Sequence, residues 1–191
     1  MPSTRLEAFS DGVIAILITI MILELHAPVA PTWAALYKSL PGLLWYLLSF
    51  VFLGIYWNNH HHMFMVVDHV NGAVLWANLH LLFWLSLVPF VTEWLGNAHF
   101  EPFPTMVYAI VLFAAAIAFT ILQRCLIALE GPNSKLAAAT EASWKEWTSL
   151  GLYAFAIAVA SWFPWMADAC FVTVAAIWIV PDRRIEAHLS E

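Results

Sequence analysis

Long apolar runs separated by short polar segments set the pattern of this chain. The hydrocarbon core of a bilayer is about 30 Å thick, so a spanning helix needs roughly 20 apolar residues, within a range of about 17–25. The runs predict six transmembrane helices in one domain over residues 1–191. Their approximate ranges are 8–25, 41–60, 70–93, 103–124, 146–163 and 164–181. The expected fold class is therefore an all-α integral membrane protein.

The last two ranges come from one apolar run, Trp147–Val180, whose 34 residues are too many for a single span. Pro164 divides the run, because proline ends or kinks a helix. The final range carries Asp168 near its start and leaves about 17 residues to cross, the lower limit for a span. An alternative with five spans therefore remains open.

The positions of the basic residues predict the orientation, because Lys and Arg are held on the cytoplasmic side during insertion. With six spans, both termini and six of the seven basic residues share one face: Arg5, Arg124, Lys135, Lys145, Arg183 and Arg184. The other face carries Lys38. We therefore expect both termini to be cytoplasmic.

Composition agrees with a membrane protein and excludes other classes. The chain is 63% hydrophobic and 10% charged, with a mean hydropathy of +0.80, whereas soluble domains are about 45–50% apolar and about 25% charged. The net charge is −6 and the chain has no basic cluster, so nucleic acid is not an expected partner. Cys125 and Cys170 both lie inside apolar runs and form no disulfide framework or CxxC metal motif.

Ser10 and Asp11 lie about one turn inside the first span, where a carboxylate is costly. One interpretation is that Asp11 benefits from the positive end of the helix dipole, worth about 0.3–1 kcal/mol. The other is that a polar partner from another helix compensates its burial. Candidate partners at the end of the second span and in the third are Trp57, Asn58, Asn59, His60, His61, His62, Asp68, His69, Trp76, Asn78 and His80.

Three of these candidates, His60, His61 and His62, are consecutive, which suggests a metal site at first sight. Neighbouring residues on a helix project about 100° apart, however, and a shared ion requires a spacing such as HxxxH, which the chain lacks. A b-type haem would need facing histidines within the membrane, and His80 alone lies deep in a span. We therefore expect interfacial hydrogen bonding, with no metal and no cofactor.

The first span is apolar on every face between Gly12 and Leu23, so periodicity does not choose a buried side. The spacing does place four residues within a stripe about 100° wide: Ile16, Thr19, Ile20 and Leu23. Such a stripe fits either helix packing or the lining of a pore. A TVGYG filter loop and the arginine ladder of a voltage sensor are both missing from the sequence.

The segment from Arg5 to Asp11 reads RLEAFSD, runs into Gly12–Ile16, and closes with Ile22–Leu25. It resembles the RxxxFSD signature that opens the endolysosomal potassium channel family (transmembrane protein 175 family) in its bacterial single-repeat form. Four later segments resemble the second and third helices of that family: Trp57–His61, Met63–Phe64, Leu75–Leu79 and Pro89–Phe90. The resemblance covers residues 4–95 by motif and the remainder by hydropathy.

The resemblance implies a homotetramer of six-helix subunits in the cell membrane, here a bacterial inner membrane. It implies passive conduction of potassium and other monovalent cations through a central pore lined by the first helix. Ile16, Thr19, Ile20 and Leu23 would line that pore, with Ile16 and Leu23 as narrow hydrophobic layers. The motif and helix-tethering residues would be Arg5, Phe9, Ser10, Asp11, Trp57, His60, His61, Trp76 and Asn78. By symmetry, Glu24 would place four carboxylates at the outer mouth and concentrate cations there.

Two positions, His62 and His80, depart from the pattern of that family and suggest pH dependence. Two other functional classes also remain. A proton- or ion-coupled transporter would use Asp11 and the histidines, although transporters usually carry polar residues near mid-membrane and the acids here lie near span ends. A membrane enzyme would need a polar constellation that the sequence does not assemble, so the chain is not expected to be an enzyme.

Overall fold

The computed structural model describes residues 1–98, 101–134, 136–137 and 144–179. Apart from an isolated β-bridge between Pro2 and His69, the regular elements of these residues are helices. They are α1 (Ser3–Leu23), α2 (Trp33–Phe64), α3 (Gly72–Ser86), α4 (Val88–Asn97), α5 (Pro102–Glu130), α7 (Trp144–Val159) and α8 (Pro164–Ile179). The all-α prediction is confirmed.

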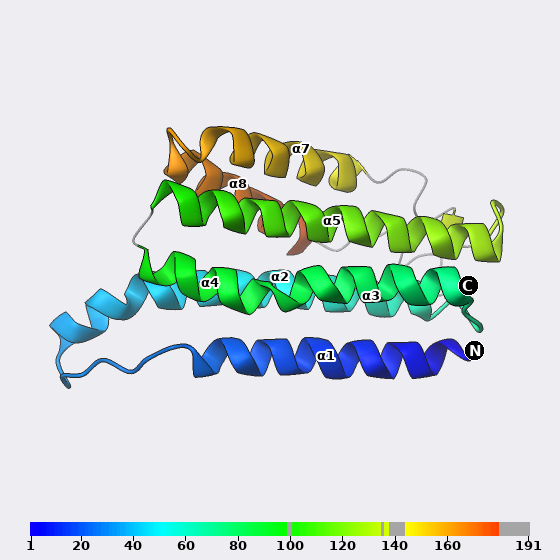
Figure 1. Cartoon of the computed structure of the whole chain (residues 1–191), viewed down its shortest axis with the longest axis horizontal. Helices are drawn as coiled ribbons and strands as arrows, with labels where there is room; N and C mark the ends of the chain where they lie inside the picture. Colours follow the sequence, from blue (N-terminus) through cyan, green and yellow to red (C-terminus); the bar gives the residue numbers. More distant parts are fainter. Residues whose placement is uncertain (99–100, 135, 138–143, 180–191) are drawn as a thin grey trace.

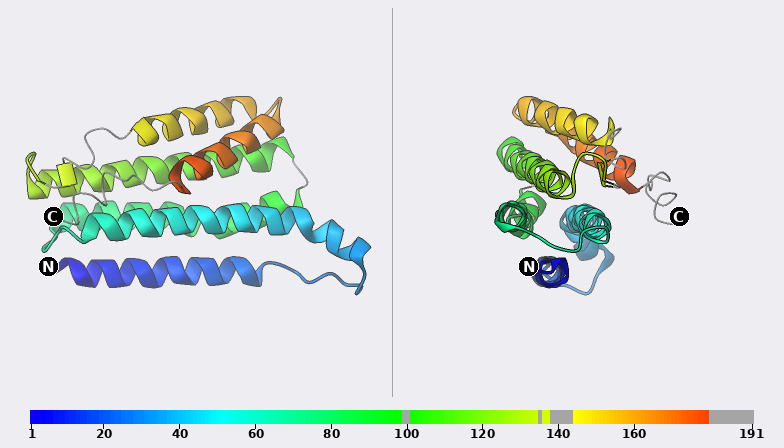
Figure 2. Two further views of the ribbon diagram at one scale, coloured as in Figure 1. Left: turned by 180° about the vertical axis from the view of Figure 1, so that it is seen from behind. Right: turned by 90° about the vertical axis from the view of Figure 1, so that its right-hand side faces the viewer.

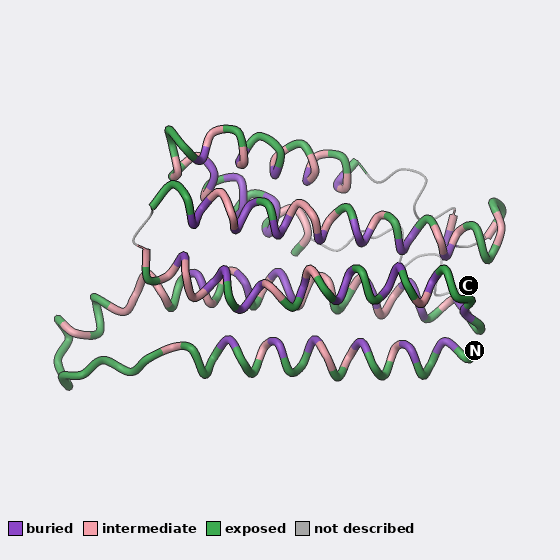
Figure 3. The backbone as a smooth tube through the Cα atoms, in the orientation of Figure 1, coloured by how far each residue is buried: buried purple, intermediate pink, exposed green. Residues whose placement is uncertain are grey.

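The helices run side by side along the length of the molecule (Figures 1 and 2). Helix α1 forms one edge and contacts α2, α3 and α4, while α7 and α8 pair at the opposite edge against α5 and α2. Because α1 contacts its neighbours from one side, its other side is open along its whole length (Figure 3).

Helices α3 and α4 form one continuous rod, Gly72–Asn97, of 26 residues. Pro89 lies at the start of α4 and interrupts the helical hydrogen bonds, because proline has no N–H and its ring clashes with the carbonyl four residues earlier. At the joint, the Leu87 N–H donates to the Trp84 carbonyl over 3.2 Å, a tighter turn than in an α-helix. The two helices together therefore correspond to the single span expected at 70–93.

Four helical rods in the described residues are long and apolar enough to cross a membrane: α1, α2, α3–α4 and α5. Helix α8 is apolar but has 16 residues, and α7 also has 16. These findings identify a helical membrane protein. The end of the expected range 164–181 lies outside the described residues, as do Lys135, Arg183 and Arg184, three of the residues used to orient the chain.

Helix α2 is longer than the expected range 41–60, because it begins at Trp33. Thr32 caps it by accepting a hydrogen bond from the Ala35 N–H, at 3.2 Å. Pro41 therefore lies inside the helix, and α2 bends in its N-terminal part (Figure 2). Next to Pro41 in the chain, Gly42 faces Gly96 of α4 so closely that a Cβ on Gly96 would lie 3.0 Å from the Gly42 Cα.

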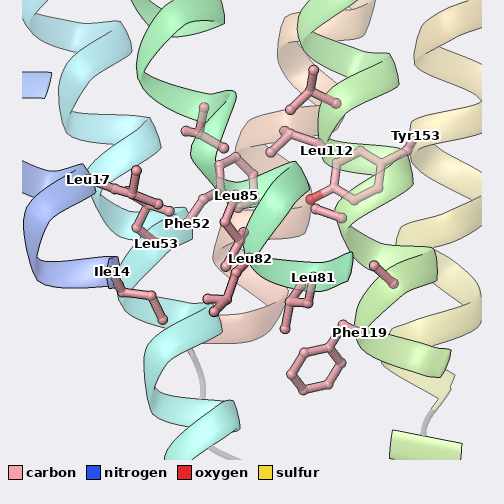
Figure 4. Close-up of a cluster of buried hydrophobic side chains, with 14 of the residues drawn as sticks. Ile14, Leu17, Phe52, Leu53, Leu81, Leu82, Leu85, Leu112, Phe119 and Tyr153 are labelled. Carbon is pink, nitrogen blue, oxygen red and sulfur yellow. The ribbon is translucent and has the colours of Figure 1, made fainter. Parts of the chain in front are cut away.

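The interior is a continuous cluster of apolar side chains from all of the helices (Figure 4). Its largest fully buried members include Tyr108, Phe52, Phe171 and Ile14. Lipid tails are as apolar as leucine, so tight packing and hydrogen bonds between helices, rather than exclusion of water, hold such a bundle together. The polar contacts described next are therefore important to its stability.

Candidate functional site

Helix α1 has two different faces. Its buried residues recur every three or four positions and point into the bundle: Ser3, Leu6, Ser10, Ile14, Leu17 and Met21. The stripe of Ile16, Thr19, Ile20 and Leu23 lies on the exposed side, where Ile16 is 57% and Leu23 78% exposed, against 1% for Ile14. Figure 3 shows this alternation along the helix. The subunit thus leaves uncovered the stripe that the sequence singles out.

Thr19 is the polar member of this stripe. Its hydroxyl donates to the carbonyl of Ile16 over 2.8 Å. The hydroxyl proton is therefore used by the helix backbone, and the oxygen of the exposed Thr19 keeps its lone pairs as acceptors. An oxygen presented in this way can accept a hydrogen bond or coordinate a cation.

A buried network fastens the other side of α1 to two helices. Asn78 of α3 donates from its amide nitrogen to the Ser10 hydroxyl over 3.0 Å, and Ser10 in turn donates to the Leu6 carbonyl over 2.9 Å. The amide oxygen of Asn78 accepts from Nε2 of His60, on α2, at 2.8 Å. Ser10, His60 and Asn78 are each 0% exposed. One asparagine thus joins α1, α2 and α3, and the loss of a partner would leave buried polar groups unpaired at a cost of about 1–3 kcal/mol each.

Two contacts nearer the surface repeat the connection between α1 and α2. The Trp57 indole N–H donates to Asp11 over 2.9 Å, and Nδ1 of His61 lies 2.7 Å from a Glu7 carboxylate oxygen. The Trp57 and His61 rings stack with their centroids 6.1 Å apart. Because α1 and α2 are antiparallel, the four-residue spacing on each helix brings both pairs together. We call these two contacts the Glu7–Asp11 clasp.

The structure thus brings together most of the expected tethering residues, but not all of them. Asp11 bonds to Trp57, whereas Ser10 meets His60 through Asn78. Within the described part of the chain, Arg5 and Trp76 form no hydrogen bond with this network, and Trp76 is 75% exposed. Phe9 is also exposed.

Sequence reasoning missed Glu7, which lies just before the expected span 8–25. The sequence did carry a signal for it: Glu7 and Asp11 are four residues apart, as are Trp57 and His61 on the antiparallel helix α2.

Two histidines, His62 and His80, depart from the family pattern. His80 accepts a hydrogen bond from the Trp84 indole at 3.0 Å. Buried Nδ1 of His62 has no partner in the described residues.

The N-terminal end of α1 is also held by the connection between α2 and α3. The Ser3 N–H donates to the Asp68 carbonyl over 3.0 Å, and the Val70 N–H donates to the Met1 carbonyl over 2.8 Å. The Met1 ammonium donates to the Val70 carbonyl over 3.0 Å. The residues before α1 thus pair with this connection like a short strand.

At its other end, α1 ends at Leu23 and is followed by its C-cap Glu24, which is exposed. Glu24 lines a cavity of about 400 Å³ between the C-terminal ends of α1 and α4 and the N-terminal part of α2, together with Glu93, His26 and Lys38. No group of three or more potential metal ligands occurs among the residues described. The C-terminal end of α1 therefore borders a cavity that carries both acidic and basic side chains.

Fold and site together define a helical membrane protein whose first helix is anchored by polar contacts on one side and uncovered on the other. Residues 5–89 match the model of the family described as endosomal/lysosomal potassium channel TMEM175. A potassium channel from Chryseobacterium sp. (strain P1-3) is 52% identical over 191 residues, covering 100% of both chains. The chain belongs to this family.

Two further similarities come from one organism, Chamaesiphon minutus. A potassium channel from strain PCC 6605 is 32% identical over 184 residues, which cover 88% of this chain and 89% of the relative. The crystal structure of a lysosomal potassium-selective channel TMEM175 homolog from this organism superposes with a TM-score of 0.82 at 28% identity, covering 93% of this chain and 96% of that one. The resemblance inferred from the RxxxFSD signature is confirmed. The family and these relatives are ion channels and not enzymes.

Proposed function

We propose that this chain is one subunit of a potassium-preferring cation channel that conducts passively through a central pore lined by α1. Four copies surround the pore, potassium is the permeant species, and no cofactor takes part. The observation that carries the proposal is the division of α1 into a polar-anchored buried face and an uncovered apolar face containing one hydroxyl. A second copy of the chain on each side would cover the flanks of this helix and leave the stripe facing the axis.

The stripe supports a pore with two hydrophobic layers. Ile16 and Leu23 are seven residues apart, about 10.5 Å along a helix and on nearly the same face. Four copies of each would form two stacked apolar rings, which repel water and set a desolvation barrier. Thr19 lies between Ile16 and Leu23 along the helix, and its exposed oxygen would offer a ligand to a cation that has shed water.

The outer mouth would receive four copies of Glu24, since this residue ends the exposed side of α1. Carboxylates grouped at an entrance raise the local concentration of cations. Glu24 would therefore increase the entry rate, whereas the choice between potassium and sodium would be made deeper, at Thr19 and the rings.

We further propose that the chain crosses a bacterial inner membrane six times, with both termini in the cytoplasm. Helices α7 and α8 would supply the two short crossings, joined by the turn at Trp162, and both are slightly shorter than a standard span. Trp144, Trp162 and Trp165 are exposed near the ends of these helices, as expected of residues at headgroup depth.

Ion flux from purified protein in liposomes tests the function. A channel releases potassium down its gradient with no second gradient present, and strict dependence on a proton gradient would instead establish a coupled transporter. The matched control is the Thr19→Val variant, which should still conduct but discriminate less between potassium and sodium. The mass of the purified oligomer tests the tetramer separately from conduction.

A further inference from the structure

Asp168 is the single acidic residue of the apolar run Trp147–Val180, and the proposed pore does not use it. It lies in the second turn of α8, toward the end of the molecule where α1 also ends (Figure 1). The N–H groups that are free at the start of a helix belong to its first four residues, here 164–167. Asp168 follows them, and the effect of the helix dipole falls off within the first turn.

Both carboxylate oxygens of Asp168 are buried, and neither has a hydrogen-bond partner among the residues described. The other buried side-chain atoms in this condition are ring nitrogens, Nδ1 of His60 and of His62. A charged carboxylate that is removed from water without partners costs far more than a neutral polar group, and a bilayer adds to that cost. The position therefore lacks the contacts that would offset a negative charge.

The surroundings of Asp168 are aromatic. Asp168 shares a face of α8 with Phe171, three residues further on, and the Phe171 ring packs against Tyr108 of α5 and Trp45 of α2, with centroids 5.0 and 6.4 Å apart. The Asp168 carboxyl group lies close enough to the Tyr108 hydroxyl to interact with it electrostatically. That hydroxyl is paired with Ser49 at 2.8 Å, however, and makes no hydrogen bond to Asp168.

The helices packed against α8 also supply no counter-ion. They are α2, α5 and α7, and the tyrosines that face the interior between them, Tyr56, Tyr108 and Tyr153, are uncharged at neutral pH. None of their other titratable groups in the described residues forms an ion pair with Asp168. These groups lie toward the helix ends: Lys38, His60, His61 and His62 on α2, Glu101 at the N-cap of α5, Arg124 and Glu130 on α5, and Lys145 and Glu146 on α7.

We propose that Asp168 is a proton-binding site, where the carboxylate takes up one proton from solution and the resulting neutral acid is held beside the aromatic cluster of Trp45, Tyr108 and Phe171. The proton replaces the hydrogen-bond donor or counter-ion that the neighbouring helices do not provide. Asp168 lies on α8 and the exposed stripe lies on α1, so this inference does not depend on the proposed ion conduction.

Proton binding at this site makes the stability of the fold depend on pH. After unfolding, the carboxyl group returns to water, where aspartate has released its proton well below neutral pH. At mildly acidic pH the folded chain then holds a proton that the unfolded chain has lost, and stability falls as the pH rises wherever the unfolded state binds fewer protons. Acidification from pH 8 to pH 5 should therefore stabilise the bundle through Asp168.

Thermal unfolding in detergent tests the proposal with Asp168→Asn, which keeps the shape of the neutral acid and cannot ionise. At pH 8 the apparent Tm of the variant should exceed that of wild type by about 3–5 °C, which corresponds to a roughly tenfold change in the folding equilibrium for a chain of this size. At pH 5 the difference should vanish. The Glu7–Asp11 clasp is the same in both proteins, so its own response to pH cancels. Asp68→Asn, at an exposed position, is the matched control and should follow wild type at each pH.

An Asp168→Asn variant that is less stable than wild type at pH 8, or that does not fold, would show that the bundle needs the negative charge and would overturn the proposal. A difference in Tm that stays constant between pH 8 and pH 5 would also overturn it. Infrared spectra in lipid vesicles at pH 5 give a direct readout, because the C=O band of a protonated carboxyl group should be weaker in Asp168→Asn than in wild type. Equal bands in the two proteins would contradict proton binding at this residue.

Discussion

The indole N–H of Trp57 donates to the Asp11 carboxylate over 2.9 Å, at a partly exposed contact. One turn away, the Asn78 network makes the same connection between helices in the buried interior. The first contact can be replaced by water and the second cannot. Substitutions at the two places should therefore have different consequences.

The buried network should be required for assembly. Asn78→Leu removes the partner of both Ser10 and His60, and each buried group left unpaired costs about 1–3 kcal/mol. We expect loss of expression or of the oligomer, measured by size-exclusion chromatography with light scattering. Asn58→Leu, at an exposed position of α2, is the control and should assemble normally. Normal assembly of Asn78→Leu would show that packing alone positions α1.

Asp11 should act through structure rather than as a ligand for permeant ions. Asp11→Ala leaves the Trp57 indole without its acceptor, so we expect reduced stability of the oligomer before any change in ion preference. A double-mutant cycle with Trp57→Phe should give a coupling of about 0.5–1.5 kcal/mol. If Asp11→Ala assembles as wild type and only its selectivity changes, Asp11 lines the pore.

The two faces of α1 should respond oppositely to polar substitution. Ile16→Asn should increase the current and weaken discrimination between potassium and sodium, because it wets the apolar ring. Leu23→Asn should do less if it lies in the wider outer mouth. Ile14→Asn, on the buried face, should impair packing without raising conductance. Bilayer recordings decide, and a larger current from Ile14→Asn than from Ile16→Asn would place the pore on the other side.

The contact between His61 and Glu7 predicts dependence on cytoplasmic pH. Histidine is the side chain whose charge changes most readily in the physiological pH range, and a protonated His61 would form an ion pair with Glu7 across this 2.7 Å contact. Acidification should therefore strengthen the contact. Open probability should therefore change between pH 8 and 5.5, and Glu7→Gln should reduce that change. A flat profile in the wild type would exclude this role for the clasp.

The orientation can be tested with single cysteines in a background lacking Cys125 and Cys170. A cysteine replacing Lys38 should react with an impermeant maleimide added outside intact cells. One replacing Ser134 should react only after the membrane is opened. The reverse pattern would contradict both the orientation and the count of six spans.

Much of the fold could be predicted from hydropathy, because the cost of placing charges in lipid marks the spans in the sequence. Helix ends could not be predicted in this way. The second span was expected to start at Pro41 because the charge-free run begins after Lys38. The helix itself, α2, begins at Trp33, where Thr32 provides the N-cap. Helix α5 likewise continues past residue 124 and ends at Glu130, where Gly131 caps it with φ at 97°. Capping chemistry, rather than hydropathy, sets these boundaries.

The sequence indicated which residues could be polar partners of α1, but not which residue bonds to which. A buried Ser10 and Asp11 require partners, and the second and third spans supply them. Which one bonds to which depends on helix rotation and on the offset between helices, and single-sequence periodicity does not determine either in a helix that is apolar all round. Glu7 was missed for a related reason, since it lies outside the span whose burial prompted the search.

The short strand-like pairing of Met1 and Ser3 with Asp68–Val70 constrains how the first helix can move. With its N-terminal end fastened, α1 cannot slide along its axis without moving the connection between α2 and α3. The diameter of the pore can then change when α1 pivots about this end. The displacement of a residue grows with its distance from the pivot. Over a helix of 21 residues, about 30 Å long, a tilt of about 5° moves the far end by about 2–3 Å. We therefore expect the ring at Leu23 to widen more than the ring at Ile16 when the helix swings.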